Sequence, residues 1–99
     1  MKAYEILYFV DPLLSDDDKD AVKKRIHETI TSLGGSVESE DAWGKQKLAY
    51  EIDDLTDGDY TLINFQSEPQ NIAEFDRVCR INDAIKRFMI VRRYEAANN

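Results

Sequence analysis

The sequence is poor in the residues that build cross-links, metal centres and catalytic sites. Its 99 residues include one cysteine, Cys79, and one histidine, His27. One thiol cannot close an internal disulfide, and this pair cannot supply the four ligands of a structural zinc site. Because a lone thiol is typical of a reducing compartment, we expect a cytoplasmic protein.

Long hydrophobic runs are also missing. The longest apolar runs are short, such as residues 6–10, whereas a membrane-spanning helix needs about 20 apolar residues. The first four residues lead directly into an alternating pattern and lack the layout of a secretory signal. We therefore expect no membrane partner.

Positive charge is scarce and unevenly distributed. The chain has 13 Lys and Arg against 20 Asp and Glu, a net charge of -7 that disfavours nucleic acid when taken as a whole. Residues 77–93 nevertheless carry six basic side chains and one acid, Asp83. Such a chain could hold phosphate in one region and a basic protein in another. The alternative is a solvated surface with uneven charge.

Apolar spacing predicts two helices and four strands. After Ser15, a suitable helix N-cap, apolar residues recur at steps of three and four until Gly34 and Gly35 end the helix. Pro69 is placed to open a second helix. The strongest signal for a hairpin turn within residues 53–58 is Asp57-Gly58, and Gly44 predicts a bend in the preceding strand. The predicted strands cover residues 2–10, 37–52, 60–66 and 85–94.

The order strand, helix, strand, strand, helix, strand predicts the fold class. It is the split βαβ pattern of ferredoxin-like α+β domains. We expect residues 1–99 to form one such domain, with a four-stranded antiparallel sheet and two helices on one face. The other face would stay open, which suits binding to RNA or protein, although fold alone does not choose between them.

No pattern of residues assembles a catalytic or cofactor site. His27 has no positioned partner, and Cys79 falls in the apolar stripe of the second predicted helix, where a core thiol is typical. The acids of residues 53–59 lack the spacing of a calcium loop, and there is no phosphate-binding glycine loop. We expect no enzyme, no cofactor, no metal and no small-molecule substrate.

The basic final strand is a candidate RNA contact. Alternation places Arg87 and Arg93 on one face and Arg92 on the other. If Phe88 and Ile90 pack on the helices, Arg87 and Arg93 project onto the open face, where arginine can grip phosphate in bidentate fashion.

A second candidate lies near the predicted bend. Trp43, Lys45 and Lys47 combine an aromatic ring with two positive charges, a plausible RNA grip. The same residues could instead be a packed tryptophan and two lysines that keep an edge strand soluble. The pattern alone leaves both interpretations open.

Three stretches of the chain together match one known pattern. They are Tyr4-Glu5-Ile6, residues 40–50 with the letters EDAWGKQKLAY, and residues 80–92 with the letters RINDAIKRFMIVR. In this order, and at this length, the chain resembles the family of bacterial small-subunit ribosomal protein six. The resemblance extends over nearly the whole chain.

The resemblance implies a structural, non-catalytic protein of the small ribosomal subunit. It implies binding to the central domain of small-subunit ribosomal RNA together with a small basic protein, small-subunit ribosomal protein eighteen. The joint role would be to stabilise an RNA junction during assembly. The implied RNA contacts are Lys2, Lys45, Lys47, Arg87 and Arg92, with Arg80 and Arg93 as further candidates.

Two other functions fit parts of the sequence. A ferredoxin-like regulatory or interaction domain that binds a small metabolite would account for the acidic balance. Thermal stabilisation by a ligand, without RNA association, would favour it. An acyl-phosphate hydrolase would need a phosphate-cradling loop after the first strand, where the sequence Asp11-Pro12-Leu13-Leu14 is acidic and apolar.

Overall fold

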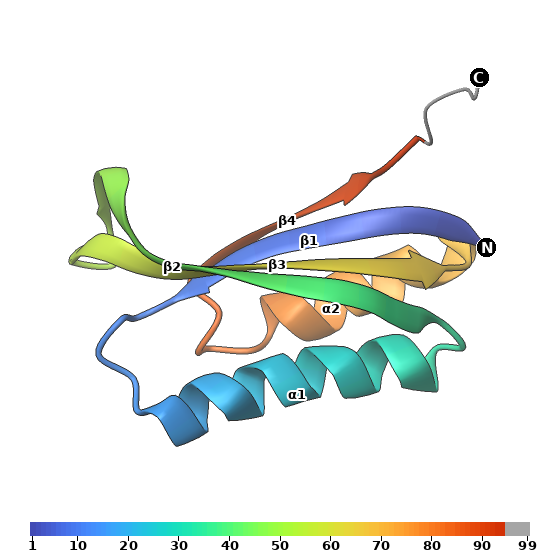
Figure 1. The fold of residues 1–99 in the computed structure, drawn as a ribbon, viewed down its shortest axis with the longest axis horizontal. Helices are drawn as coiled ribbons and strands as arrows, with labels where there is room; N and C mark the ends of the chain where they lie inside the picture. Colours follow the sequence, from blue (N-terminus) through green and yellow to red (C-terminus); the bar gives the residue numbers. More distant parts are fainter. Residues whose placement is uncertain (95–99) are drawn as a thin grey trace.

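The computed structural model describes residues 1–94, and within them it contains the predicted strands and helices in the predicted order (Figure 1). The strands form an antiparallel sheet with the order β2-β3-β1-β4, and both helices cover one face of it. The ferredoxin-like α+β prediction is confirmed. The elements are β1 (Lys2–Val10), α1 (Asp16–Ser32), β2 (Ser36–Ile52), β3 (Leu55–Ser67), the 3₁₀ turn η1 (Pro69–Asn71), α2 (Ile72–Arg80) and β4 (Arg87–Arg92).

The hydrophobic core lies between the sheet and the two helices. Every second residue of β1 points into it, because successive strand side chains alternate between faces. The predicted face of α1 packs against these residues, and Ser15 caps the helix by accepting a hydrogen bond from the Asp18 N–H at 3.1 Å. The buried cluster consists of Tyr4, Ile6, Tyr8, Val10, Val22, Ile26, Ile30, Ile63, Phe65, Phe75, Cys79 and Ile85.

The bend predicted at Gly44 is confirmed. Gly44 has a φ of 77°, and the pairing of β2 with β3 changes register between Ala42 and Gly44. Such a β-bulge redirects the strand. Beyond it, residues 45–58 form a hairpin that extends past Val10 at the end of β1 and curls upward at the left of Figure 1. We call this hairpin the β2–β3 arm.

The turn predicted within residues 53–58 is confirmed, but it does not lie at Asp57-Gly58, where its signal is strongest. The chain reverses at Asp53 and Asp54, whose φ angles of 51° and 65° are both left-handed, with Ile52 paired to Leu55 around them. Two successive left-handed residues are the geometry of a two-residue hairpin turn. Gly58 instead lies within β3, where a Cβ atom would come within 2.6 Å of the Phe9 ring.

The last strand is shorter than predicted. The ladder of β4 covers Arg87–Arg92 rather than residues 85–94. Single hydrogen bonds continue on either side, from the Lys86 N–H to the Phe9 carbonyl at 3.0 Å and from the Arg93 N–H to the Ala3 carbonyl at 2.8 Å. Pro69 opens the η1 turn, which leads directly into α2.

Candidate nucleic-acid interface

The edge strand β4 separates two different surfaces. Phe88 and Ile90 pack against the core, so the alternate residues Arg87 and Arg93 point to the sheet face without helices, as expected. We call this side the open face. Arg92 is paired in register with the core residue Tyr4 and therefore points to the helix side.

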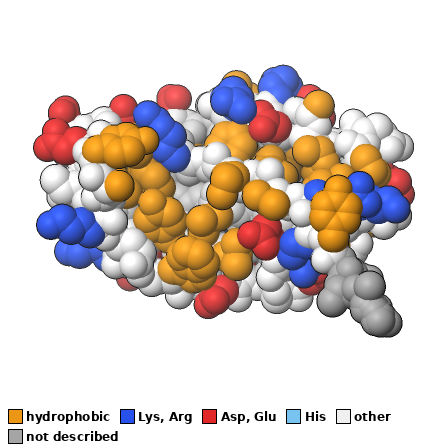
Figure 2. Space-filling model, turned by 90° about the horizontal axis from the view of Figure 1, so that it is seen from above, with side chains coloured by type: hydrophobic (Ala, Val, Ile, Leu, Met, Phe, Trp, Pro, Cys, Tyr) orange, Lys and Arg blue, Asp and Glu red, His pale blue; other side chains and the backbone are white. Residues whose placement is uncertain are grey.

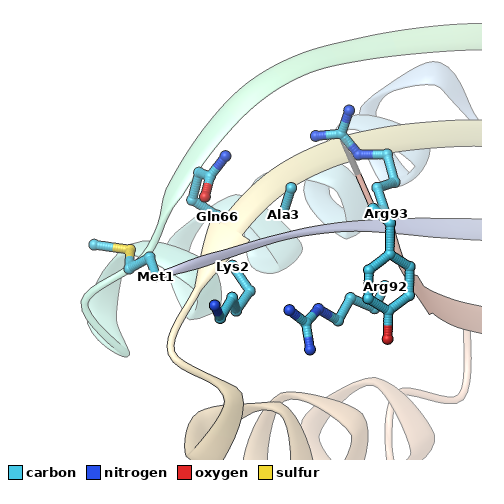
Figure 3. A pocket seen from close by; sticks show the side chains of 7 residues that line it. Met1, Lys2, Ala3, Gln66, Arg92 and Arg93 are labelled. Carbon is cyan, nitrogen blue, oxygen red and sulfur yellow. The ribbon is translucent and has the colours of Figure 1, made fainter. Parts of the chain in front are cut away.

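A cavity of about 260 Å³ opens at the end of β4, beside the start of β1 (Figure 3). Lys2 lies on the same sheet face as Arg92, and both side chains point below β1 in Figure 3. The Arg92 guanidinium lies 4.7 Å from the centre of the Tyr94 ring, an attractive cation–π arrangement. We call this cavity the basic pocket. Its lining consists of Met1, Lys2, Ala3, Gln66, Arg92, Arg93 and Tyr94.

Two cations of the basic pocket, Lys2 and Arg92, have no acidic partner within the described part of the chain. Neither Lys2 nor Arg92 forms an ion pair with any residue between 1 and 94. The nearby amino terminus lies 3.7 Å from a carboxylate oxygen of Glu68. The pocket therefore offers two positive charges to an external anion.

Arg93 differs from Arg92 because it already has a partner. Its guanidinium donates to the carboxylate of Glu38, which also accepts a hydrogen bond from the Gln66 side chain at 2.7 Å. These bonds, that of Gln66 most of all, hold the pKa of Glu38 below its usual value. In Figure 3 Arg93 points away from Lys2 and Arg92.

The arginines of α2 are also paired. Arg77 donates twice to Glu74, at 2.9 and 2.7 Å, which raises the pKa of Arg77 and lowers that of Glu74. Arg80 donates to Asp76 at 2.8 Å and lies over the Phe88 ring, 5.4 Å from its centre. An RNA phosphate would have to compete with these carboxylates.

Arg87 is held more loosely. Its side chain is 60% exposed and donates to the carbonyl of Lys86 at 2.7 Å. Its nearest acid is Asp53 at the tip of the β2–β3 arm, with a nitrogen–oxygen distance of 3.9 Å. A contact of this length between exposed groups is weak, so Arg87 can turn to an external phosphate.

The lysines of the β2–β3 arm lie apart from the basic pocket. Lys45 and Lys47 are exposed and form no ion pair with residues 1–94. Trp43 beside them stacks on Tyr60, with ring centres 6.3 Å apart, and is 45% exposed. Trp43 is thus a packed residue that still presents much of its ring to solvent.

The open face is apolar over much of its area. Met89 is 57% exposed and Val91 39% exposed, and by the strand register Met89 lies beside Leu7, which is paired in turn with Leu62. Figure 2 looks down on this face and shows hydrophobic side chains across its middle, with acidic and basic ones among and around them. Exposed patches of this kind mark interaction sites.

A cluster of charged groups on the helix side links β2 to α1. Glu40 of β2 lies 2.9 Å from the Lys23 Nζ and 3.0 Å from the His27 Nε2, both on α1. The Lys23 hydrogen bond lowers the pKa of Glu40 and raises that of Lys23. Cys79 is a core thiol as predicted, and burial raises its pKa to about 12, which keeps it protonated.

The sequence predictions for the RNA contacts fall into three groups in space. Lys2, Arg92 and Arg93 line the basic pocket, Arg80 and Arg87 line a separate hollow with Lys86, and Lys45 and Lys47 lie on the arm. Tyr94 was missed, although its position two residues after Arg92 places both on one face of an extended chain. Within residues 1–94 neither helix is long and apolar enough to cross a membrane.

The fold and these surfaces define a structural binding protein, with free cations at one end of a ferredoxin-like sheet and an apolar open face. The sequence model of the family described as Ribosomal protein S6 matches residues 3–92 of this chain. The chain is 47% identical over 92 residues to small ribosomal subunit protein bS6 of Symbiobacterium thermophilum, covering 93% of this chain and 97% of that relative. It is 45% identical over 91 residues to bS6 of Clostridium acetobutylicum, covering 92% and 96%.

A solved structure agrees with the sequence relatives. The crystal structure of 30S ribosomal protein S6 from Thermotoga maritima matches with a TM-score of 0.87 at 28% identity, covering 93% of this chain and 87% of that one. The chain belongs to the ribosomal protein S6 family. It is a ribosome-associated protein of the small subunit, from a family not known to be enzymatic, with ribosomal RNA as its implied partner.

Proposed function

We propose that this chain binds the central domain of small-subunit ribosomal RNA together with small-subunit ribosomal protein eighteen. In the cytoplasm it would act as one domain that stabilises an RNA junction during assembly of the subunit. The observation that supports the RNA contact is that Lys2 and Arg92 both line the basic pocket and that neither has an acidic partner among residues 1–94.

The predicted RNA contacts differ in how readily they can bind phosphate. Lys2 and Arg92 come first, because no internal ion pair has to be broken. Arg87 and the arm lysines follow, since Arg87 has a long contact with Asp53 and the lysines are exposed. The last two candidates, whose guanidinium groups already bind carboxylates, are Arg80 and Arg93.

An RNA strand along the free edge of β4 reaches residues on both sides of the sheet. Arg87 points to the open face and Arg92 to the helix side, and β4 is an edge strand. At about 3.3 Å per residue, the two positions lie roughly 17 Å apart along the strand. A phosphate backbone that follows this edge can therefore contact both arginines.

The open face is the surface proposed for the partner protein. It carries the exposed apolar residues Met89 and Val91, while the chain as a whole has a net charge of -7. A small basic protein would cover the apolar area and offset the long-range repulsion between this chain and RNA. No observation on residues 1–94 specifically favours the alternative of a metabolite-binding regulatory domain.

The test is RNA affinity with and without the partner. The purified chain would be titrated with RNA of the central domain, alone and in the presence of small-subunit ribosomal protein eighteen. We expect weak binding alone and much tighter binding with the partner, because the partner supplies positive charge. Tight binding that the partner does not improve, or no binding in either case, would contradict the proposal.

A further inference from the structure

Glu5 places a carboxylate within the apolar part of the open face. It lies in the central strand β1, directly opposite Val91 of β4 and Asn64 of β3. Its neighbours Tyr4 and Ile6 are core residues, so alternation turns Glu5 to the open side. Leu7 follows it on the same face, and Figure 2 shows acidic side chains among the hydrophobic ones there.

This carboxylate has no ion-pair partner in the described part of the chain. No cation of residues 1–94 lies within 4.0 Å of Glu5. By register the nearest candidate on the open face is Arg93, which follows β4 and whose guanidinium binds Glu38. Glu5 therefore presents a free negative charge, half-buried among its neighbours.

The fold does not account for an acid at this position. Glutamate is disfavoured in strands, and between Leu7 and Val91 an apolar side chain would extend the packing of the face. Where a residue type disfavoured by the local structure has no compensating contact, function is the expected reason for its presence. We therefore expect Glu5 to interact with whatever protein covers the open face.

Any protein that covers Met89 and Val91 by apolar contact also covers Glu5, because Val91 lies directly opposite it. Removing an unpaired carboxylate from water is strongly unfavourable, whereas a carboxylate matched by a cation and hydrogen bonds is tolerated. The occupant must therefore bring a positive group to that point. An occupant that lacks one is rejected, which is how an apolar surface acquires specificity.

We propose that Glu5 pairs with a lysine or arginine of the protein that covers the open face, and so selects a basic occupant. The inference rests on the proposed function, in which that occupant is small-subunit ribosomal protein eighteen. Apolar residues such as Met89 and Val91 supply contact area, while Glu5 fixes which partner fits and in what register.

The experiment measures the affinity of the full chain for purified protein eighteen. Glu5→Gln keeps the size of the side chain and removes its charge, and Glu28→Gln makes the same charge change on an exposed position of α1. We expect Glu5→Gln to weaken binding about tenfold or more, Glu5→Lys to weaken it further, and Glu28→Gln to leave it unchanged. A thermal melt of each variant checks that the fold is retained.

A third variant separates failure of the inference from failure of the proposed function. Met89→Asp places an uncompensated charge on the apolar part of the open face and should abolish docking there. If Met89→Asp weakens binding while Glu5→Gln does not, the role of Glu5 is wrong and the docking face stands. If the wild-type chain binds and neither variant matters, the proposed face is wrong. If the wild-type chain does not bind, the proposed partner itself is wrong.

Discussion

The basic residues at the end of α2 differ in their neighbours from Lys2 and Arg92 of the basic pocket. Arg77 and Arg80 each bind an acid three or four residues earlier, the spacing that brings side chains together on a helix. Lys2 and Arg92 lie on strands, where alternation places Arg92 opposite Tyr4, and neither has an ion-pair partner within residues 1–94. These four residues thus differ in availability because their elements give them different neighbours.

This difference decides which cations suit RNA. A phosphate that approaches Arg80 must replace the carboxylate of Asp76, so the gain is the difference between two similar contacts. A phosphate that enters the basic pocket replaces only water around Lys2 and Arg92. Variants at the free cations and at the paired cations therefore test this comparison.

Removing the free cations of the basic pocket should have the largest effect on RNA binding. For Lys2→Gln combined with Arg92→Gln, we expect affinity for central-domain RNA to fall about thirtyfold, or ~2 kcal/mol, since charge-assisted bonds are lost. The salt dependence of binding should lose a slope of about two. Filter binding over a range of salt concentrations measures both quantities.

The matched control removes the same charge elsewhere. Lys24 and Arg25 are exposed on α1 and form no ion pair with residues 1–94. Lys24→Gln with Arg25→Gln should therefore show only the small long-range effect of the charge change. An equal loss of affinity in both double variants would mean that overall charge, and not the pocket, governs binding.

The arm lysines should have an intermediate effect. Lys45→Gln with Lys47→Gln removes two exposed charges beside Trp43, and we expect RNA affinity to fall about tenfold, or ~1.4 kcal/mol. Trp43→Leu in the same assay separates stacking on RNA from packing on Tyr60, because only the first would lower affinity without lowering the melting temperature. An unchanged affinity in the lysine variant would remove the arm from the interface.

Paired charges should contribute to the fold instead of to RNA binding. The pKa of Glu40 is lowered from 4.5 in the folded state, so its contribution is present above that pH and is lost as the pH falls through the folded value. Glu40→Gln should therefore flatten the fall in unfolding free energy between pH 6 and 3, by less than about 1 kcal/mol for so exposed a pair. Chemical denaturation at each pH measures it.

The RNA affinity of Glu40→Gln serves as the check on this assignment. It should match that of the wild-type chain at neutral pH, because Lys23 and His27 lie on α1 and contact Glu40 of β2 and do not line the basic pocket. A marked change in RNA affinity would show that the helix side contributes to the interface. The distinction between paired and free charges would then fail on that side.

Releasing a paired arginine should give the smallest effect, and in the opposite direction. Asp76→Asn removes the carboxylate that holds Arg80, so Arg80 becomes available beside Lys86 and Arg87. We expect RNA affinity to rise about twofold to threefold, with a slightly steeper salt slope. Unchanged or weaker RNA binding would place Arg80 outside the path of the RNA.

The sequence predicts the elements well where periodicity is clear. The strand over residues 2–10 and the helix capped by Ser15 are observed as expected, because alternation in β1 and the apolar steps of α1 reflect one shared core. The hairpin turn lies within the predicted residues 53–58 but not at Asp57-Gly58, because the glycine there is required for close packing against Phe9. Such a contact joins two strands and leaves no local signal.

The site is less predictable than the fold. Single residues such as Arg92 and Lys2 are visible in the sequence, but their meeting depends on the antiparallel register of β1 with β4. The same holds for Arg93 and Glu38, which are 55 residues apart in the chain. Ion pairing across the sheet therefore decides which arginines stay available, and local spacing does not reveal it.

The most direct test compares two double variants that each remove two positive charges, one from the free cations of the basic pocket and one from the paired arginines of α2. RNA titration over a range of salt concentrations is carried out for Lys2→Gln with Arg92→Gln and for Arg77→Gln with Arg80→Gln. Because both double variants lose two positive charges, any difference between them reflects whether the cations are free to bind phosphate. We expect the first to lose a slope of about two and about thirtyfold in affinity, and the second to stay within about twofold of the wild type. Equal losses in both variants would contradict the claim that free cations form the RNA contact.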